Sequence, residues 1–265
     1  MDYDTWGQLG NRGWSFDDVL PFFQKMEHYE HGEDDLRSQG GPLRVSKATD
    51  EGPLYDAITA ASKELGIPHN PDYNGKSQEG IVRTQTTISN GVRMSTARCY
   101  LNPVKNRPNL RIETNAHVQK LLFEGKKCSG VHFRKNGQDR FVHAHKEVIV
   151  CTGGVASPQL LELSGIGQAQ ILTDNGIEVK HELNGVGEHL RDHINARIQF
   201  NMKRGELSYN QRMQGLGPVW QVMKYIFQRR GFMTLPSAPM LAFLRTREDI
   251  CLLYTSDAAD ERNSG

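Results

Sequence analysis

The sequence has few cysteines, no long apolar segment and no secretory signal pattern. Its four cysteines are scattered along 265 residues, in neither a metal-ligand spacing nor a disulfide framework. This use of cysteine favours a reducing compartment, so we expect a cytoplasmic protein. No apolar run approaches about 18 residues, the length of a membrane-spanning helix. Residues 1–30 also lack the basic-then-apolar order of a signal peptide.

An excess of charge of either sign is missing as well. The formal net charge is +1, and no basic tract occurs. The composition therefore gives no reason to expect a nucleic-acid partner. Hydrophobic residues make up 37% of the chain, which is typical of a globular sequence with one or two domains.

The stretch from Val148 to Gly167 organises the rest of the sequence. It opens with β-branched Val148–Val150, the composition of a strand buried on both faces. Thr152, Gly153 and Gly154 follow, and they are small enough to let a bulky group approach the backbone.

A helix is predicted to follow this glycine turn. Ser157 is suited to cap it, Pro158 to occupy its first turn and Gly165 to end it. Free N–H groups at such a helix start suit an anionic or dipolar cofactor. An ordinary turn between a strand and a helix explains the same geometry without a ligand.

Helices and loops are predicted for the first 80 residues. Ser15 and Asp18 have the spacing of a capping box at the start of a helix. Residues 28–52 are polar and contain glycine, so we expect a solvated loop. A second helix is predicted from Pro53 to its glycine end at Gly66.

Strands are predicted for the middle of the chain. Residues 80–88 alternate as in a strand, and Asn90-Gly91 is a turn signal. Residues 110–114 are expected to form a short strand. Segments 118–123, 128–134 and 141–145 are separated by turn residues and predict an antiparallel meander.

The later part of the chain is predicted to add short elements. We expect a helix over 168–175, ended by Gly176, and strands over 177–183 and 194–202. Apolar residues recur at helical spacing over 219–227, with Lys224 on the polar side. That helix can lie on a membrane surface or, as we favour, pack on a sheet.

Two further patterns suggest binding sites that we do not favour. The run from Gly185 to Leu190 imitates the start of a phosphate-binding glycine motif but lacks its last glycine and its strand-to-helix frame. His189 and His193 are four residues apart, yet no third metal ligand has a fixed spacing. We expect no metal site, and we expect His143 and His145 to be solvated or hydrogen-bonded.

Gly153 to Gly167 resembles the second signature of the glucose-methanol-choline (GMC) flavin-dependent oxidoreductases. The match consists of Ser157-Pro158, Leu160-Leu161 and Ser164-Gly165-Ile166-Gly167. Gly154 stands where the family usually has Ala, Ser, Thr or Pro. The chain from Asp2 to Glu27, the run 91–101 and the run 185–193 also resemble family segments, although His189 replaces the usual Asn.

The resemblance covers about residues 2–250 and implies an α/β fold that is incomplete. It implies a partial, Rossmann-like FAD-binding domain over 1–27 and 95–190, whose Gly-x-Gly-x-x-Gly unit we expect to precede this chain. It also implies a partial α+β substrate domain on a mainly antiparallel sheet over 28–94 and 191–250.

FAD is the cofactor that the resemblance implies, and a small alcohol is the implied substrate. Val118 would meet the adenine through its backbone, and Thr152, Gly153, Gly154 and Ser157 would contact the cofactor. The family oxidises alcohol carbons by hydride transfer to flavin N5 while a histidine accepts the hydroxyl proton. We expect that histidine in a C-terminal region beyond this chain, so none of the ten histidines present is predicted to be catalytic.

Among family members, the run looks most like bacterial choline and alcohol dehydrogenases. The electron acceptor is left open. Two other interpretations remain: an FAD-containing lyase of the same family, and a truncated product without function.

The last fifteen residues, Cys251 to Gly265, look foreign to the protein. The stretch Cys251–Glu261 can be encoded by a string that resembles a transposase adapter used in sequencing libraries. We therefore expect natural sequence to stop near Ile250 and exclude 251–265 from the fold.

Overall fold

The computed structural model describes residues 2–48, 52–192, 196, 198–199, 213–236 and 238–245. The chain divides into two compact units: Met1–Arg107 with Ala196–Ala258, and Pro108–Asn195 with the last residues. These boundaries differ from the two predicted domains, whose assignment to cofactor and substrate stays a prediction. Among the described residues, no helix is both long and apolar enough to cross a membrane.

The first unit begins with two helices, α1 (Asp2–Gln8) and α2 (Phe16–Met26). The predicted capping box at α2 is confirmed, because Ser15 Oγ accepts the Asp18 N–H at 3.4 Å and Asp18 Oδ2 accepts the Ser15 N–H at 3.2 Å. Pro21 lies inside α2 without ending it. The predicted helix after Gly52 is also confirmed as α3 (Pro53–Glu64), and Gly66 follows it with φ +73°.

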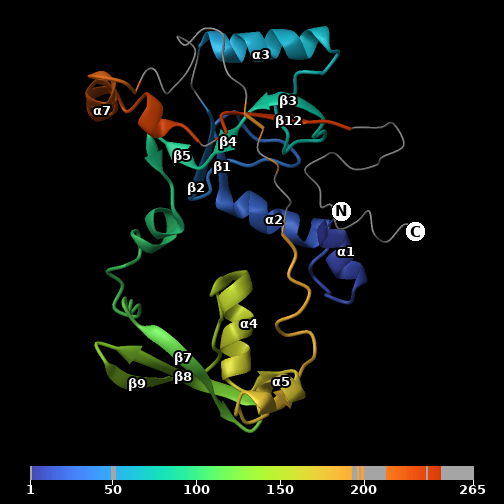
Figure 1. Ribbon diagram of the computed structural model, residues 1–265, viewed down its shortest axis with the longest axis vertical. Coiled ribbons are helices and arrows are strands. Elements are labelled where there is room, and N and C mark those ends of the chain that lie inside the picture. The colour runs from blue at the N-terminus through green and yellow to red at the C-terminus, as the bar shows by residue number, and fades with distance from the viewer. Residues whose placement is uncertain are drawn as a thin grey trace. The chain divides into compact units, whose positions relative to one another are not determined.

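Several short sheets make up the rest of the first unit (Figure 1). One has the order β1 (Glu27–Tyr29), β2 (Leu43–Lys47), β4 (Gln85–Thr86), with β1 parallel and β4 antiparallel to β2. A second pairs β3 (Gly80–Arg83) with β12 (Met240–Phe243). The predicted loop over 28–52 is thus wrong in part, because polar residues there take part in strand pairing.

The predicted strand over 80–88 is divided among three strands with different partners. Its last part, β5 (Ile88–Ser89), forms a hairpin with β6 (Val92–Arg93). The turn predicted at Asn90-Gly91 is confirmed, with φ values of +50° and +68° that suit these residues. A π-helix, η1 (Ala97–Leu101), follows, and Ser95 Oγ accepts the Arg98 N–H at 3.3 Å, as expected of a cap.

A buried arginine holds the segments of the first unit together. Arg37 is 4% exposed, and its guanidinium contacts Glu27 Oε1 at 2.6 Å and Asp72 Oδ1 at 3.3 Å. It also donates to Gln85 Oε1 at 3.1 Å and lies 4.0 Å from the ring centroid of Tyr29. The Arg37 side chain thus connects β1, β4 and two loops. The polar sequence around Arg37 did not predict its burial.

The environment of Tyr29 shows that water is largely excluded from the Arg37 cluster. Tyr29 is 5% exposed, and burial raises the pKa of its phenol to about 12, with the Asp72 carboxylate acting in the same direction. A phenol in this position stays neutral and presents its ring face to Arg37. The charge of Arg37 is therefore balanced by Glu27 and Asp72 alone among the described acidic groups.

In the second unit, the predicted meander is confirmed as three antiparallel strands. These are β7 (His117–Glu124), β8 (Lys127–Lys135) and β9 (Gln138–His143), in the order β7-β8-β9. Two register irregularities interrupt the β7-β8 ladder, one of them between Val118 and Lys120. The short strand predicted for 110–114 is wrong, since those residues pair with no described strand.

Helix α4 (Gly153–Leu163) contacts β7, and β10 (Ile166–Gly167), α5 (Ala169–Asp174) and β11 (His181–Glu182) complete the second unit. The α5 prediction is confirmed, whereas the strand predicted over 177–183 shortens to β11. The strand predicted at Val148–Val150 is wrong: these residues have no regular structure, and Ile149 is 74% exposed. A β-branched run becomes a strand only with a neighbouring strand to pair with, and no described strand does so.

The predicted amphipathic helix is confirmed as α7 (Gly217–Gln228), followed by η3 (Phe232–Thr234). Its apolar residues are uncovered by the described part of the chain: Trp220 is 68% exposed and Phe227 is 74% exposed. The predictions for 251–265 and for most of 194–202 lie outside the described residues.

Replacing Arg37 with Met should lower the free energy of unfolding of the first unit by about 3–5 kcal/mol, because Glu27 and Asp72 would lose their cation while largely buried. Urea unfolding followed by tryptophan fluorescence measures this, since Trp6, Trp14 and Trp220 all lie in the first unit. Arg12→Met, at an exposed arginine, is the control and should change stability little. An equal loss in both variants would contradict the role of Arg37.

Candidate cofactor site

The start of α4 is the feature of the second unit best suited to bind a ligand. The helix begins at Gly153, with Thr152 as the N-cap residue and no side-chain capping bond. Ser157 was predicted to cap the helix, and this is wrong, because Ser157 lies inside it. The Oγ atoms of Ser157 and Thr152 are instead 3.0 Å apart.

Helix α4 begins earlier than predicted because of the backbone conformation of Gly153. Gly153 has φ +91°, which only glycine adopts readily, so the chain turns there and enters the helix at once. Pro158 therefore falls inside α4 rather than in its first turn. The predicted end of the helix is confirmed, since Gly165 follows the C-cap with φ +88°.

The backbone at Gly153 and Gly154 is open to a ligand. A Cβ atom built on either glycine would meet no heavy atom within 4 Å. The first N–H groups of an α-helix have no intrahelical acceptor, and the helix dipole favours negative charge beside them. Free donors, open space and two hydroxyl groups at Thr152 and Ser157 fit a polar or anionic part of a cofactor.

A cavity of about 670 Å³ lies along this helix. Residues of α4 from Gly154 to Glu162 form one wall, and the segment Gly185–Arg191 forms the other. Its surface includes apolar side chains, with Val155 71% and Leu190 72% exposed. The cavity therefore offers both polar backbone and apolar contact to the same ligand.

The segment Gly185–Arg191 is held beside α4 by specific contacts. Gly187 has φ +81°, a conformation that favours glycine, and a Cβ built there would lie 2.7 Å from Glu162 Oε1 of α4. Gln168 Nε2 also donates to Glu188 Oε1 at 2.6 Å. Gly187, one of the two glycines that imitate a phosphate motif here, thus serves close packing against α4, whereas Gly185 has open space around it.

Val118, the fifth predicted cofactor residue, lies on β7 opposite Phe133 of β8 and is half-buried. Because β7 is an edge strand of its sheet, its outer side pairs with no strand among the described residues. One backbone group of this edge strand, the Leu121 N–H, donates to Ser164 Oγ of the α4 end. The predicted contact of Val118 with an adenine ring stays a prediction.

Ser164 and Gly165 also make packing contacts that the sequence did not predict. Ser164 is 3% exposed, and its Oγ accepts the Leu121 N–H at 2.8 Å while donating to the Leu160 carbonyl at 2.5 Å. A Cβ on Gly165 would lie 2.4 Å from the Glu178 carbonyl oxygen. These two residues fasten the end of α4 to β7 and to the segment before β11.

Among the described residues, no group of three or more His, Cys, Asp or Glu side chains is placed to hold a metal ion. His189 lies in the segment beside the cavity and has φ +57°, a value that Asn tolerates better than most residues. His193 lies outside the described residues.

The family model for GMC oxidoreductases matches residues 1–195. This is well over half of the chain, so the chain belongs to the GMC oxidoreductase family.

The chain is also similar in sequence to curated choline dehydrogenases. An oxygen-dependent choline dehydrogenase of Photobacterium profundum is 36% identical over 248 residues, covering 93% of this chain and 44% of the relative. The mitochondrial choline dehydrogenase of Homo sapiens is 43% identical over 198 residues, covering 75% of this chain and 33% of the relative. The chain thus spans less than half the length of these relatives.

Solved structures agree with this assignment. An FAD-dependent oxidoreductase from Chaetomium thermophilum superposes with a TM-score of 0.78 at 26% identity, covering 91% of this chain and 45% of that one. A formate oxidase of Aspergillus oryzae, studied for its FAD modification, gives 0.79 at 26% identity, with coverages of 92% and 44%. The mixed α/β fold with several small sheets is therefore that of FAD-binding GMC oxidoreductases, and the family implies FAD as cofactor.

Replacing Ser164 with Ala should cost about 1–3 kcal/mol of stability, because the Leu121 N–H would be buried without an acceptor. Hydrogen exchange measured by mass spectrometry should show faster exchange in the peptide that contains Leu121. Ser157→Ala on the same helix removes a hydroxyl that contacts only a neighbouring hydroxyl in the described contacts, and it is the control. Unchanged exchange at Leu121 in Ser164→Ala would contradict the role of the bond.

Proposed function

We propose that this chain is part of an FAD-dependent oxidoreductase that oxidises the CH–OH group of a small alcohol. The observation that carries the proposal is the open Gly153-Gly154 backbone at the start of α4, in a chain of the GMC family. When bound, FAD would supply the hydride acceptor for this chemistry. The residues of this chain would bind and orient the cofactor.

In this proposal the start of α4 holds a polar part of FAD. The free N–H groups of Gly153 and Gly154 would donate to it, with the hydroxyls of Thr152 and Ser157 beside them. Val118 would meet the adenine edge with its backbone groups. Val155 and Leu190, both exposed beside the cavity, would keep water from the bound cofactor.

The domain assignment belongs to the same proposal. Residues 1–27 and 95–190 would form part of the FAD-binding domain, and 28–94 with 191–250 part of the substrate domain. A hydroxyl proton must also be accepted during alcohol oxidation, and general bases of this kind are most often histidines. We place that base outside this chain and assign it to none of the histidines present.

The names of the relatives support a proposal for the substrate class. Several curated relatives are named choline dehydrogenases, so choline and other small alcohols are the substrates we propose. An FAD-containing lyase is the second candidate, because family membership alone does not require net redox chemistry. The electron acceptor is not part of the proposal.

The test uses the full-length protein that contains this chain, purified and mixed anaerobically with choline, ethanol or benzyl alcohol. We expect the flavin absorbance near 450 nm, about where oxidised flavins absorb, to bleach with at least one alcohol. A protein that binds FAD, cleaves a hydroxylated substrate and never bleaches would be the lyase. A protein that purifies without flavin would overturn both candidates.

Replacing Gly154 with Leu in the full-length protein should reduce bound FAD at least about tenfold, since the side chain would fill the open approach to α4. Gly154 does not require a positive φ, so the fold should tolerate the change. Gly154→Ala, which carries a residue common at this position in the family, is the control and should keep its flavin. Gly153→Leu should also lose FAD, with added strain from φ +91°. A fully yellow Gly154→Leu protein would show that FAD lies elsewhere.

Residues 1–250 expressed alone should neither retain FAD nor oxidise alcohols. Ile149, Val155 and Leu190 would remain exposed, and apolar surface of this kind promotes aggregation. Flavin absorbance of the purified chain and dye reduction with choline measure the two properties. A soluble, yellow chain that reduces the dye would contradict the prediction and direct the search for the base to its own histidines.

A further inference from the structure

The two faces of the β1-β2-β4 sheet carry different kinds of charge. Side chains alternate across a strand, so Glu27, Tyr29 and Gln85 share the face that contacts Arg37. The opposite face carries His28 and Arg44, which are paired in register, and Ser46 and Thr86, which are paired likewise. These four residues line a cavity of about 330 Å³.

Cations dominate the walls of this cavity. Arg44 comes from β2, while Arg229 and Arg230 come from the end of α7. Lys47 also borders the cavity, but it is paired in register with Gln85 and so belongs to the face that contacts Arg37. None of the three arginines forms an ion pair with a carboxylate among the described residues 2–48, 52–192, 213–236 and 238–245. This differs from Arg37 on the other face, which has two carboxylate partners.

Glu30, the one carboxylate among the described residues that line the cavity, is already engaged. Glu30 Oε1 accepts the backbone N–H of Lys47 at 2.6 Å and lies 3.3 Å from His31 Nε2. It therefore holds the strand in place and does not neutralise the arginines. His28 Nδ1 accepts the Gly40 N–H at 3.1 Å, so its hydrogen in the neutral ring is on Nε2, which adds another donor to this side.

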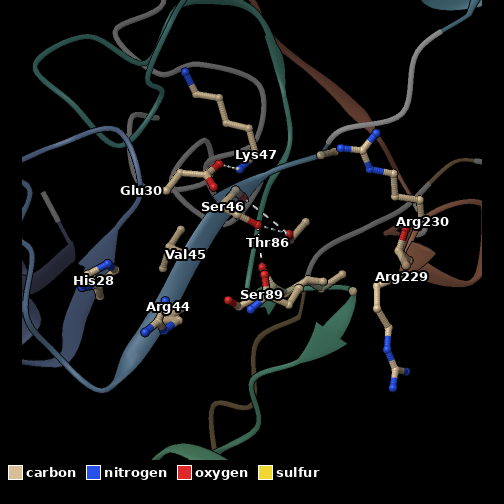
Figure 2. A pocket seen from close by; sticks show the side chains of 15 residues that line it. His28, Glu30, Arg44, Val45, Ser46, Lys47, Thr86, Ser89, Arg229 and Arg230 are labelled. Atoms are coloured by element: carbon tan, nitrogen blue, oxygen red, sulfur yellow. Dashed lines mark hydrogen bonds between the residues drawn. The ribbon is translucent and has the colours of Figure 1, made fainter. Parts of the chain in front are cut away.

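Close backbone contacts fix the wall that carries the two adjacent arginines. A Cβ on Gly91 would lie 2.5 Å from the Arg229 carbonyl oxygen, so the β5-β6 turn packs directly on the end of α7. Arg229 itself has φ +53°, an unusual conformation for a residue with a side chain. In Figure 2, Arg230 reaches back toward the end of β2, while Arg229 extends away from the Ser46–Thr86 pair.

We propose that this cavity, which we call the basic pocket, binds a small molecule bearing a phosphate group. Guanidinium groups recognise phosphate through paired hydrogen bonds, and the hydroxyl group of Ser89 also lines the cavity. The Ser46 hydroxyl donates to the Ile88 carbonyl at 2.6 Å and is therefore not a donor for the ligand. The volume lies at the lower end of ligand sites and suits a phosphomonoester rather than a nucleotide. The basic pocket lies within the first unit, so this proposal does not depend on alcohol oxidation.

The phosphate group can come from a soluble metabolite or from a lipid headgroup, and the test separates the two. The full-length protein is titrated by calorimetry with inorganic phosphate, glycerol 3-phosphate and succinate at constant ionic strength. It is also sedimented with vesicles of phosphatidylglycerol or phosphatidylcholine. Saturable binding of the soluble phosphates alone identifies a metabolite site, and retention on phosphatidylglycerol vesicles alone identifies a headgroup site.

Arg44→Gln and Arg230→Gln should each weaken binding of the phosphate probe about tenfold, the usual effect of losing a charge-assisted hydrogen bond. Both arginines are exposed, so circular dichroism and the urea midpoint should stay unchanged. Arg12→Gln, an exposed arginine outside the pocket, should bind as the unaltered protein does. Equal binding by all three variants, the absence of saturable binding, or succinate binding as tight as phosphate would overturn the proposal.

Discussion

Two hydrogen bonds at one buried hydroxyl hold the proposed cofactor site in place. Ser164 Oγ joins the last turn of α4 to the edge of β7. Gly165 brings the same helix end against the chain before β11. With its C-terminal end fixed, α4 can present an N-terminal turn that contacts little of the described protein. The backbone at Gly153 and Gly154 is therefore open to a ligand, while the helix that begins there is anchored at its other end.

In the first unit, the charges on the two sides of the β1-β2-β4 sheet differ: one side has a buried, paired arginine and the other has exposed arginines that pair with no described carboxylate. On one face, Arg37 is removed from water, and its charge is matched by Glu27 and Asp72. Such a cluster is costly to leave half-satisfied, so it specifies how four segments meet. On the other face, Arg44 and Arg230 keep their contact with water and have no carboxylate partner in the described chain. Unmatched cations around a cavity leave their hydrogen-bonding capacity to a ligand.

Prediction failed where local composition was taken as sufficient. Val148–Val150 has the composition of a buried strand, yet a strand needs a partner, and the described residues supply none. Ser157 has the chemistry of a helix cap, but the left-handed turn at Gly153 starts the helix five residues earlier than a Ser157 cap would. In both cases the local preference was genuine, and a contact or a backbone conformation elsewhere decided the outcome.

The sequence by itself determined the family, through the run from Gly153 to Gly167, and the elements with strong local signals. These include the capping box at Ser15, the helix after Pro53 and the meander from His117 to His143. Only the tertiary structure decided that Ser164 is a structural anchor, that Arg37 is buried, and that Arg44 and Arg230 line one cavity. Capping and turn signals act between residues a few positions apart, where the sequence can be read directly. Burial and charge pairing join residues tens of positions apart, and their partners become known only when the chain has folded.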